Sequence, residues 1–269
     1  MATRSGDQGF QKGARDYAAY LETAEGRLRT DLVFANLQEF LRTSQTVKTL
    51  HALDVGSGTG AIAARLAQLG FQVSQLDSSE EMLNIARHTA DKAGVMDRVT
   101  FVHGDAGQLA DLFGAAAFDV ILCHNLLEYV DDPTLVLRGV ARTLRGNSAI
   151  LSIVVRNQMG EVLKAAIQAG DLTAAETNLN AEWGFESLYG GRVRLFTSAG
   201  LRAMLTSESL ELIAERGVRV VADYLPPNIS RTAQYERIFE LERKLSARPE
   251  VAAIARYVHC LARRKENRT

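Results

Sequence analysis

The 269-residue sequence predicts an α/β fold built on a Rossmann-like, seven-stranded mixed sheet with helices on both faces. Short apolar segments recur about every 20–25 residues, with helically spaced apolar residues between them, which is typical of βαβ units and a mainly parallel sheet. The first of these segments runs directly into a glycine-rich turn, Gly56-Ser57-Gly58-Thr59-Gly60. Such a turn lets backbone amides approach a ligand closely, because glycine has no Cβ and tolerates positive φ.

The region before the first strand is predicted to be helical. Residues 1–13 are polar and are expected to form an irregular lead-in, whereas the apolar positions from Ala14 to about Leu41 follow helical spacing. One or two helices therefore precede the sheet. The first five strands are predicted at 49–55, 71–76, 98–103, 118–124 and 148–155, with helices at 61–69, 80–93 and 134–144 between them.

After the fifth strand the alternation changes. An insertion with helical stretches at 161–169 and 174–180 precedes a helix that begins near Thr197. A short element at 209–216 leads to a sixth strand at 218–224, and an amphipathic helix at 229–245 leads to a last strand at 256–262. The chain accordingly divides into an N-terminal helical segment (1–45), a cofactor-binding core (46–156), a helical insertion or substrate cap (157–196) and the C-terminal part of the same domain (197–269).

Composition favours a cytoplasmic globular protein. The formal net charge is −1, which gives no global attraction to nucleic acid or to an anionic membrane. Cys123 and Cys260 lie far apart, without metal-ligand spacing, so neither a zinc site nor a disulfide framework is expected. No apolar run is long enough to span a bilayer, and residues 1–13 lack the apolar core of a signal peptide.

The glycine-rich turn fits two kinds of cofactor. Gly56, Gly58 and Ala61 satisfy the loose dinucleotide pattern G-x-G-x-x-G/A, with Asp77 about 20 residues further on. However, Asp54 stands directly before the glycines, and a pyrophosphate disfavours a nearby negative charge. S-adenosylmethionine carries an ammonium and a sulfonium but no phosphate, so a carboxylate at this position favours it.

Polar residues also follow the next strands. Asp77, Asp105 and His124 end the second, third and fourth segments, and carboxyl ends of parallel strands meet at one edge of a sheet, where ligands bind. Asp77 is expected to accept hydrogen bonds from ribose hydroxyls and Asp105 from an adenine amino group. The sequence therefore predicts an S-adenosylmethionine site at this edge.

The sequence resembles the class I S-adenosylmethionine-dependent methyltransferases in four segments: LDVGSGTG at 53–60, LDSSEEML at 76–83, VHGDAGQL at 102–109 and FDVILCHNLLEYVDDP at 118–133. The resemblance implies a seven-stranded sheet whose last strands form an antiparallel hairpin. It also implies cofactor contacts around the glycine loop and at the next three strand ends. These residues are Asp54, Gly56, Ser57, Gly58, Asp77, Ser78, Asp105, Ala106 and His124.

A closer resemblance, over nearly the whole chain, is to the tRNA 5-carboxymethoxyuridine methyltransferases. It rests on EGRLR at 25–29, HNLLEYVDDP at 124–133, YERIFELE at 235–242 and ARYVHCLARR at 255–264. The resemblance implies that Arg29 reaches the cofactor's carboxylate and that the acceptor is a wobble uridine in a tRNA anticodon loop. A small-molecule O- or N-methyltransferase is the alternative, and a non-catalytic cofactor-binding regulator is a third.

The chemical class of the methyl acceptor decides which catalytic groups the enzyme needs. A carboxylate is ionised at neutral pH and needs only a cationic or hydrogen-bonding group to orient it; Arg156, Arg192 and Arg194, with Asn157 beside them, are the candidates. A hydroxyl or amine needs a base, and His124 is the candidate. Three aromatic residues of the insertion, Trp183, Phe185 and Tyr189, could stack on a base or form the small core of a helical cap, and the cap is the favoured interpretation.

Overall fold

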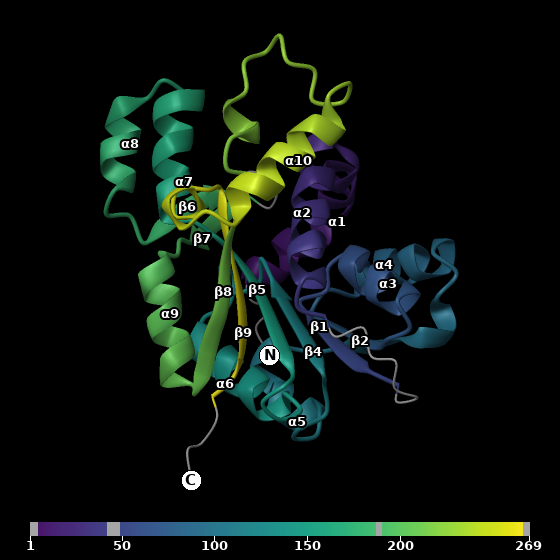
Figure 1. Ribbon diagram of the computed structural model, residues 1–269. Helices are drawn as coiled ribbons and strands as arrows, with labels where there is room; N and C mark the ends of the chain where they lie inside the picture. The colour runs from purple at the N-terminus through teal and green to yellow at the C-terminus, as the bar shows by residue number, and fades with distance from the viewer. Residues whose placement is uncertain (1–4, 42–48, 187–189, 266–269) are drawn as a thin grey trace.

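The computed structural model describes residues 5–41, 49–186 and 190–265. Its seven-stranded sheet has the order β3-β2-β1-β4-β5-β9-β8, in which β9 is antiparallel to both of its neighbours and the other pairs are parallel (Figure 1). A separate two-stranded hairpin lies in the insertion. The strands are β1 (His51–Val55), β2 (Gln72–Asp77), β3 (Val99–His103), β4 (Val120–His124), β5 (Ile150–Arg156), β6 (Trp183–Glu186), β7 (Gly191–Arg194), β8 (Leu210–Val218) and β9 (Tyr257–Arg264).

Helices cover both faces of the sheet, as predicted. One face packs against α5 (Leu109–Leu112), α6 (Pro133–Thr143) and α9 (Ser198–Ser207), whose leucines and valines join the apolar side chains of β1, β4 and β5 in one core. The other face packs against helices that contribute mainly small apolar residues to a second core. These helices are α2 (Ala24–Gln38), α3 (Ala61–Gln68) and α4 (Glu80–Lys92). α1 (Ser5–Glu22) lies against α2 and α4, while α10 (Tyr235–Ser246) and α11 (Pro249–Ala252) contact β8.

Three predicted boundaries are wrong, and one of them is the start of the helix predicted at 229–245, which begins only at Tyr235. The predicted lead-in is helical from Ser5 onward, because α1 starts there. The sixth strand is Leu210–Val218 rather than 218–224. This strand forms the edge of the sheet, so charged residues such as Glu211 and Arg216 alternate along it and weaken its apolar signal. The more apolar residues 219–224 form a turn ending in the 3₁₀ helix Ala222–Tyr224.

The insertion is helical in its first half, with α7 (Gln158–Leu163), a π-helical turn (Lys164–Gln168) and α8 (Leu172–Asn178). Its second half is the β6–β7 hairpin, which the sequence did not reveal. The division of the chain into four segments stays a prediction. Among the described residues, none of the helices has the length and apolar character needed to cross a membrane.

The antiparallel last strand determines what lies at the carboxyl edge of the sheet. β9 begins where its neighbours end, so that Tyr257 pairs with Arg156 on one side and with Val218 on the other. The edge that carries the glycine loop therefore also carries Arg219, which follows β8, and Arg256, which precedes β9. Residues at the ends of β1, β5, β8 and β9 therefore meet at one edge of the sheet.

Candidate active site

A cavity of about 1290 Å³ opens at the carboxyl edge of the sheet. Pockets for one small molecule are usually about 300–1,000 Å³, so this cavity has room for a cofactor and part of an acceptor. The loops after β1 to β5 form its floor, α1 and α2 supply tyrosines and Arg29, and β7 contributes to the remaining wall.

The glycine loop has the predicted form. Gly56, Gly58 and Gly60 all adopt left-handed conformations, with φ of 67°, 51° and 71°. A Cβ on Gly56 would stand 2.8 Å from the Leu126 side chain, and one on Gly60 would stand 2.6 Å from the buried amide of Gln75. The Gly58 N–H donates a hydrogen bond of 2.8 Å to Asp77 Oδ2, which ties the loop to the end of β2. At these glycines the loop therefore presents backbone atoms, and no side chains, to the cavity.

The acids around the loop suit the predicted cofactor. Asp54 is buried, and burial together with the neighbouring Asp77 raises its pKa to about 7. An ammonium group placed beside it would reverse this shift. Burial also raises the pKa of Asp77, whose two oxygens accept from the Gly58 and Ser79 N–H groups and keep further lone pairs for ribose hydroxyls. Asp105 caps the turn that follows β3 by accepting from the Gly107 N–H at 2.7 Å.

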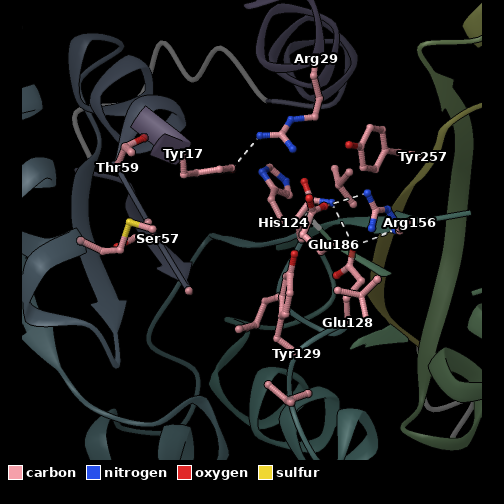
Figure 2. A pocket seen from close by; sticks show the side chains of 18 of the residues that line it. Tyr17, Arg29, Ser57, Thr59, His124, Glu128, Tyr129, Arg156, Glu186 and Tyr257 are labelled. Carbon is pink, nitrogen blue, oxygen red and sulfur yellow. Dashed lines mark hydrogen bonds and ion pairs between the residues drawn. The ribbon is translucent and has the colours of Figure 1, made fainter. Parts of the chain in front are cut away.

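Arg29 extends from α2 into the cavity toward His124 and Tyr257 (Figure 2). Its guanidinium donates to the Tyr17 hydroxyl at 2.7 Å and lies 5.3–5.6 Å from the ring centroids of Tyr17, Tyr20 and Tyr257. Within the part of the chain that the structure describes, no acidic side chain forms an ion pair with it. A buried cation without a counter-ion favours an anionic ligand group, as expected for the cofactor's carboxylate.

His124 belongs to a buried hydrogen-bond chain. Its Nε2 lies 2.8 Å from Ser152 Oγ, and Ser152 Oγ lies 2.8 Å from His259 Nε2. Asn36 Nδ2 lies 3.4 Å from His259 Nδ1, and Asn36 Oδ1 accepts from Ser246 Oγ. Burial lowers the pKa of both imidazoles, to about 3 for His124, so both rings are neutral at physiological pH.

The order of donors in this chain sets the His124 tautomer. Because an amide nitrogen only donates, His259 accepts at Nδ1 and carries its proton on Nε2. That proton is donated to Ser152, whose hydroxyl then donates to Nε2 of His124. His124 consequently carries its proton on Nδ1. It is arranged as a neutral hydrogen-bond donor, which fits a positioning role and not that of a general base.

An arginine cluster forms the wall opposite the glycine loop. Arg156 forms ion pairs with Glu161 at 3.0 Å and Glu186 at 2.8 Å. Arg256 shares Glu161 at 2.7 Å, and Arg219 pairs with Asp223. Figure 2 shows Arg156 between Glu186 and Tyr257.

Tyr257 reports the electrostatic potential of this wall. Burial alone would raise its pKa, but the guanidinium groups of four arginines outweigh burial and lower the pKa to about 8. The guanidinium carbons of Arg29, Arg219 and Arg256 lie 5.6–5.9 Å from the centroid of the Tyr257 ring. The potential here stabilises negative charge.

Two further arginines lie on β7. The guanidinium carbons of Arg192 and Arg194 both stand 4.6 Å from the centroid of Trp183. Arg194 Nε is buried without a hydrogen-bond partner among the described residues. Neither guanidinium forms an ion pair with a carboxylate in that part of the chain. They are available to an anion.

The cavity brings together all but one of the residues predicted to contact the cofactor or to orient the acceptor. Asn157 is the exception: its side chain caps α7 and donates to the Ala253 and Ala255 carbonyls, so it is structural. Arg156 lies at the cavity, but two glutamates already occupy its guanidinium. The residues that line the cavity are Arg29, Asp54, Gly56, Ser57, Gly58, Asp77, Ser78, Asp105, Ala106, His124, Arg156, Arg192 and Arg194.

The favoured cap interpretation of the aromatic residues is wrong for two of them. Trp183 and Phe185 are 38% and 67% exposed on the hairpin, and the small core of the insertion is formed by Val162, Ala165 and Ala175 instead. Tyr189 lies outside the described residues.

Sequence reasoning missed the tyrosines of α1 and the arginines beside β9. Tyr17, Tyr20 and Arg219 line the cavity but stand in segments without a recognisable motif, and the ARYVHCLARR resemblance gave its Tyr257 no role. The available sequence signal for Arg219 was a single charged residue in the apolar run 218–222, where the structure gives it a φ of 60°. Glu128 also lines the cavity; it is buried and accepts from the Asn125 amide and the Arg156 N–H.

Comparisons with known proteins agree with this site. A family model described as a methyltransferase domain matches residues 53–152. The tRNA 5-carboxymethoxyuridine methyltransferase of Escherichia coli strain K12 is 28% identical over 91% of this chain and 92% of its own length. A ubiquinone biosynthesis O-methyltransferase of Xanthomonas oryzae pv. oryzae is 36% identical, but over only 39% of this chain and 43% of its own.

Among solved structures, the CcbJ methyltransferase of Streptomyces caelestis shares the fold. Its TM-score is 0.63 at 18% identity, and the match covers 98% of this chain and all of that one. The matched domain spans the glycine loop and the strand-end acids at 77 and 105, which face a cavity that also holds the Arg29 guanidinium. The chain therefore carries a methyltransferase domain over residues 53–152 and is an S-adenosylmethionine-dependent methyltransferase.

Proposed function

We propose that the enzyme methylates the carboxylate of 5-carboxymethoxyuridine at the wobble position of tRNA. The observation that carries this proposal is the arginine cluster around Tyr257, because a wall that lowers a phenol pKa to about 8 also favours a carboxylate acceptor. The full-length similarity to the tRNA 5-carboxymethoxyuridine methyltransferase supports the same substrate. The ubiquinone-pathway relatives match less than half of this chain.

The chemistry needs no proton transfer. In the reaction the acceptor oxygen forms a bond to the methyl carbon while the S–CH₃ bond breaks, which leaves a methyl ester and a neutral thioether. The protein has to hold the two groups close and aligned, a contribution of up to roughly 7–11 kcal/mol. His124 suits this task, since a neutral donor can hydrogen-bond an anion without taking its charge.

Arg194 is proposed to orient the acceptor carboxylate. Arg194 lines the cavity and its buried Nε has no hydrogen-bond partner among the described residues, whereas the guanidinium groups of Arg156 and Arg219 are already paired with acids. Arg29 is proposed to hold the cofactor carboxylate. The acceptor and cofactor carboxylates would then have separate arginines.

The test is methylation of tRNA that carries 5-carboxymethoxyuridine by the purified chain with S-adenosylmethionine. We expect an alkali-labile methyl ester on the wobble nucleoside, detected by mass spectrometry after digestion. Asp77→Ala, which removes the ribose acceptor, should abolish the product. Transfer to a small phenol, with unchanged tRNA, would contradict the proposal and favour the small-molecule alternative.

A further inference from the structure

The β6–β7 hairpin has two chemically different faces. Register pairs Trp183 with Arg194 and Phe185 with Arg192, so these four side chains share one face. Gly184, Glu186 and Val193 belong to the other face. The hairpin can therefore be attached to the protein on one side and present the other.

The second face provides the attachment. Val193 is 1% exposed, and Glu186 forms the 2.8 Å ion pair with Arg156 at the end of β5. A Cβ on Gly184 would stand only 3.1 Å from Leu195, so this face packs closely. The hairpin is held in register with the arginine wall of the active site.

The first face has no such role in the fold. Phe185 and Trp183 expose 67% and 38% of their surface, although large aromatic side chains are normally buried. The two arginines beside them have no acidic partner among the described residues. Trp183, Arg192 and Arg194 also line the active-site cavity, so this face is continuous with it.

We propose that the face formed by Trp183, Phe185, Arg192 and Arg194 is a platform for single-stranded RNA next to the target base. This inference rests on the proposed tRNA substrate and assigns the surface that recognises it. Aromatic rings and guanidinium planes stack on unpaired bases, and guanidinium groups also neutralise phosphates. Exposed aromatics interleaved with unpaired arginines match a loop of RNA, in which bases are unstacked, better than a duplex.

The platform separates recognition of the RNA from recognition of the carboxylate. Phe185 lies outside the cavity lining, and Arg192 is its cross-strand neighbour. Nucleotides that flank the wobble base would stack there while the modified base enters the cavity. RNA should therefore be a far better substrate than the isolated nucleoside.

The experiment compares two acceptors that carry the same carboxylate: a stem-loop RNA with 5-carboxymethoxyuridine in its loop, and the free nucleoside. We expect the hairpin variant Phe185→Ala, which changes a residue outside the cavity lining, to lower kcat/KM for the stem-loop by at least tenfold, and the ratio of RNA to nucleoside kcat/KM by a similar factor. Arg192→Ala should weaken the salt dependence of the RNA reaction by about 0.7 in log–log slope, as expected for one lost phosphate contact.

Arg98→Ala/Arg142→Ala is the control, because it removes one partly exposed and one exposed arginine that precede β3 and β5, at the opposite edge of the sheet. It should leave the ratio unchanged. Equal losses of the hairpin variant on both acceptors would overturn the platform. If neither acceptor is methylated, the proposed function fails instead. Fluorescence anisotropy with an unmodified stem-loop then tests the platform separately. Equal RNA affinity of the wild type and the hairpin variant, or an acidic peptide that binds more tightly than the stem-loop, would overturn the platform.

Discussion

Asp54 is a carboxylate that the fold buries without a counter-ion among the described residues. Its pKa rises to about 7 because of burial and because of the neighbouring Asp77. A carboxyl group with a raised pKa binds protons more tightly in the folded than in the unfolded chain, so its ionisation destabilises the ligand-free protein as the pH rises from about 4 to 7. We propose that the cofactor's positive charge compensates for this loss of stability when it binds beside Asp54.

Asp54→Asn should therefore stabilise the ligand-free enzyme and weaken cofactor binding. At pH 8 the gain in unfolding free energy has an upper bound of about 4 kcal/mol, since the pKa lies about three pH units above its ordinary value and each unit is worth about 1.4 kcal/mol. Urea unfolding measures the first effect and calorimetry with S-adenosylmethionine the second. Asp111→Asn, at an exposed position, is the control variant. An Asp54 variant that binds the cofactor normally would refute the assignment of Asp54 to the cofactor site.

The two buried imidazoles predict the opposite pH dependence. His124 and His259 stay neutral in the folded protein, whereas an unfolded histidine takes up a proton below its ordinary pKa of about 6.5. Stability contributed by these groups is thus present above pH 6.5 and is lost as the pH falls below it.

Between pH 7.5 and 5.5 the wild type should lose about 1.4 kcal/mol more unfolding free energy than His259→Gln, because one neutral buried imidazole has been removed. Urea unfolding at the two pH values provides the comparison. His88→Gln, at an exposed position, should behave like the wild type. Parallel losses in the wild type and the His259 variant would show that the buried chain does not hold neutral imidazoles.

At the scale of elements, α10 positions one side of the arginine wall. The fully buried Glu242 accepts hydrogen bonds of 2.7–2.9 Å from the backbone N–H groups of Val220, Val221 and Ala222. These residues directly follow Arg219, whose guanidinium pairs with Asp223 and donates to the Tyr20 hydroxyl at 2.7 Å. The YERIFELE segment therefore ends in a residue that anchors a turn of the candidate active site.

Glu242→Gln should cost about 2–3 kcal/mol of unfolding free energy, the usual contribution of a hydrogen bond to a charged group when a buried donor loses its partner. Chemical denaturation measures it. Glu240→Gln changes an exposed glutamate of the same helix, which pairs only with Arg243, and should cost less than about 0.5 kcal/mol. Similar losses for the two variants would contradict an anchoring role for Glu242.

The strands differ in how well the sequence predicts them. The strands of the parallel half were predictable because they are buried on both faces and read as apolar runs that end in a polar residue. β8 and the β6–β7 hairpin were not, because strands with one exposed face carry residues such as Glu211 and Arg192 at alternate positions. Their charged residues resemble those of a loop or a helix surface.

At the scale of the whole molecule, the two halves of the cavity differ in how far apart in the sequence their residues lie. The cofactor half is assembled from strand ends within residues 54–124, where short motifs report residue types directly. The proposed acceptor half joins Arg156 to Arg219, Arg256 and Tyr257, which meet only after the sheet is complete. No local pattern could reveal this wall, although the strand-end acids identified the cofactor.

Cofactor binding should stabilise the folded chain as a whole. With S-adenosylmethionine at about 100 times its Kd, binding contributes about 2.7 kcal/mol, which raises Tm by roughly 5–10 °C for a domain of this size. Differential scanning fluorimetry with increasing cofactor measures the shift. Asp77→Ala should abolish it, whereas Asp111→Ala should retain it; a shift that persists without Asp77 would place the cofactor elsewhere.

The position of β9 has a consequence for synthesis. This strand is the last of the sheet's seven strands in sequence order, yet it lies inside the sheet, between β5 and β8 (Figure 1). While the nascent chain is still emerging from the ribosome, β5 and β8 have no common partner, and the glycine loop exists before Tyr257 and His259 do. A polypeptide interrupted before residue 257 would thus possess the motifs of a methyltransferase without its acceptor wall, and competence arises only when the final residues of the sheet are made.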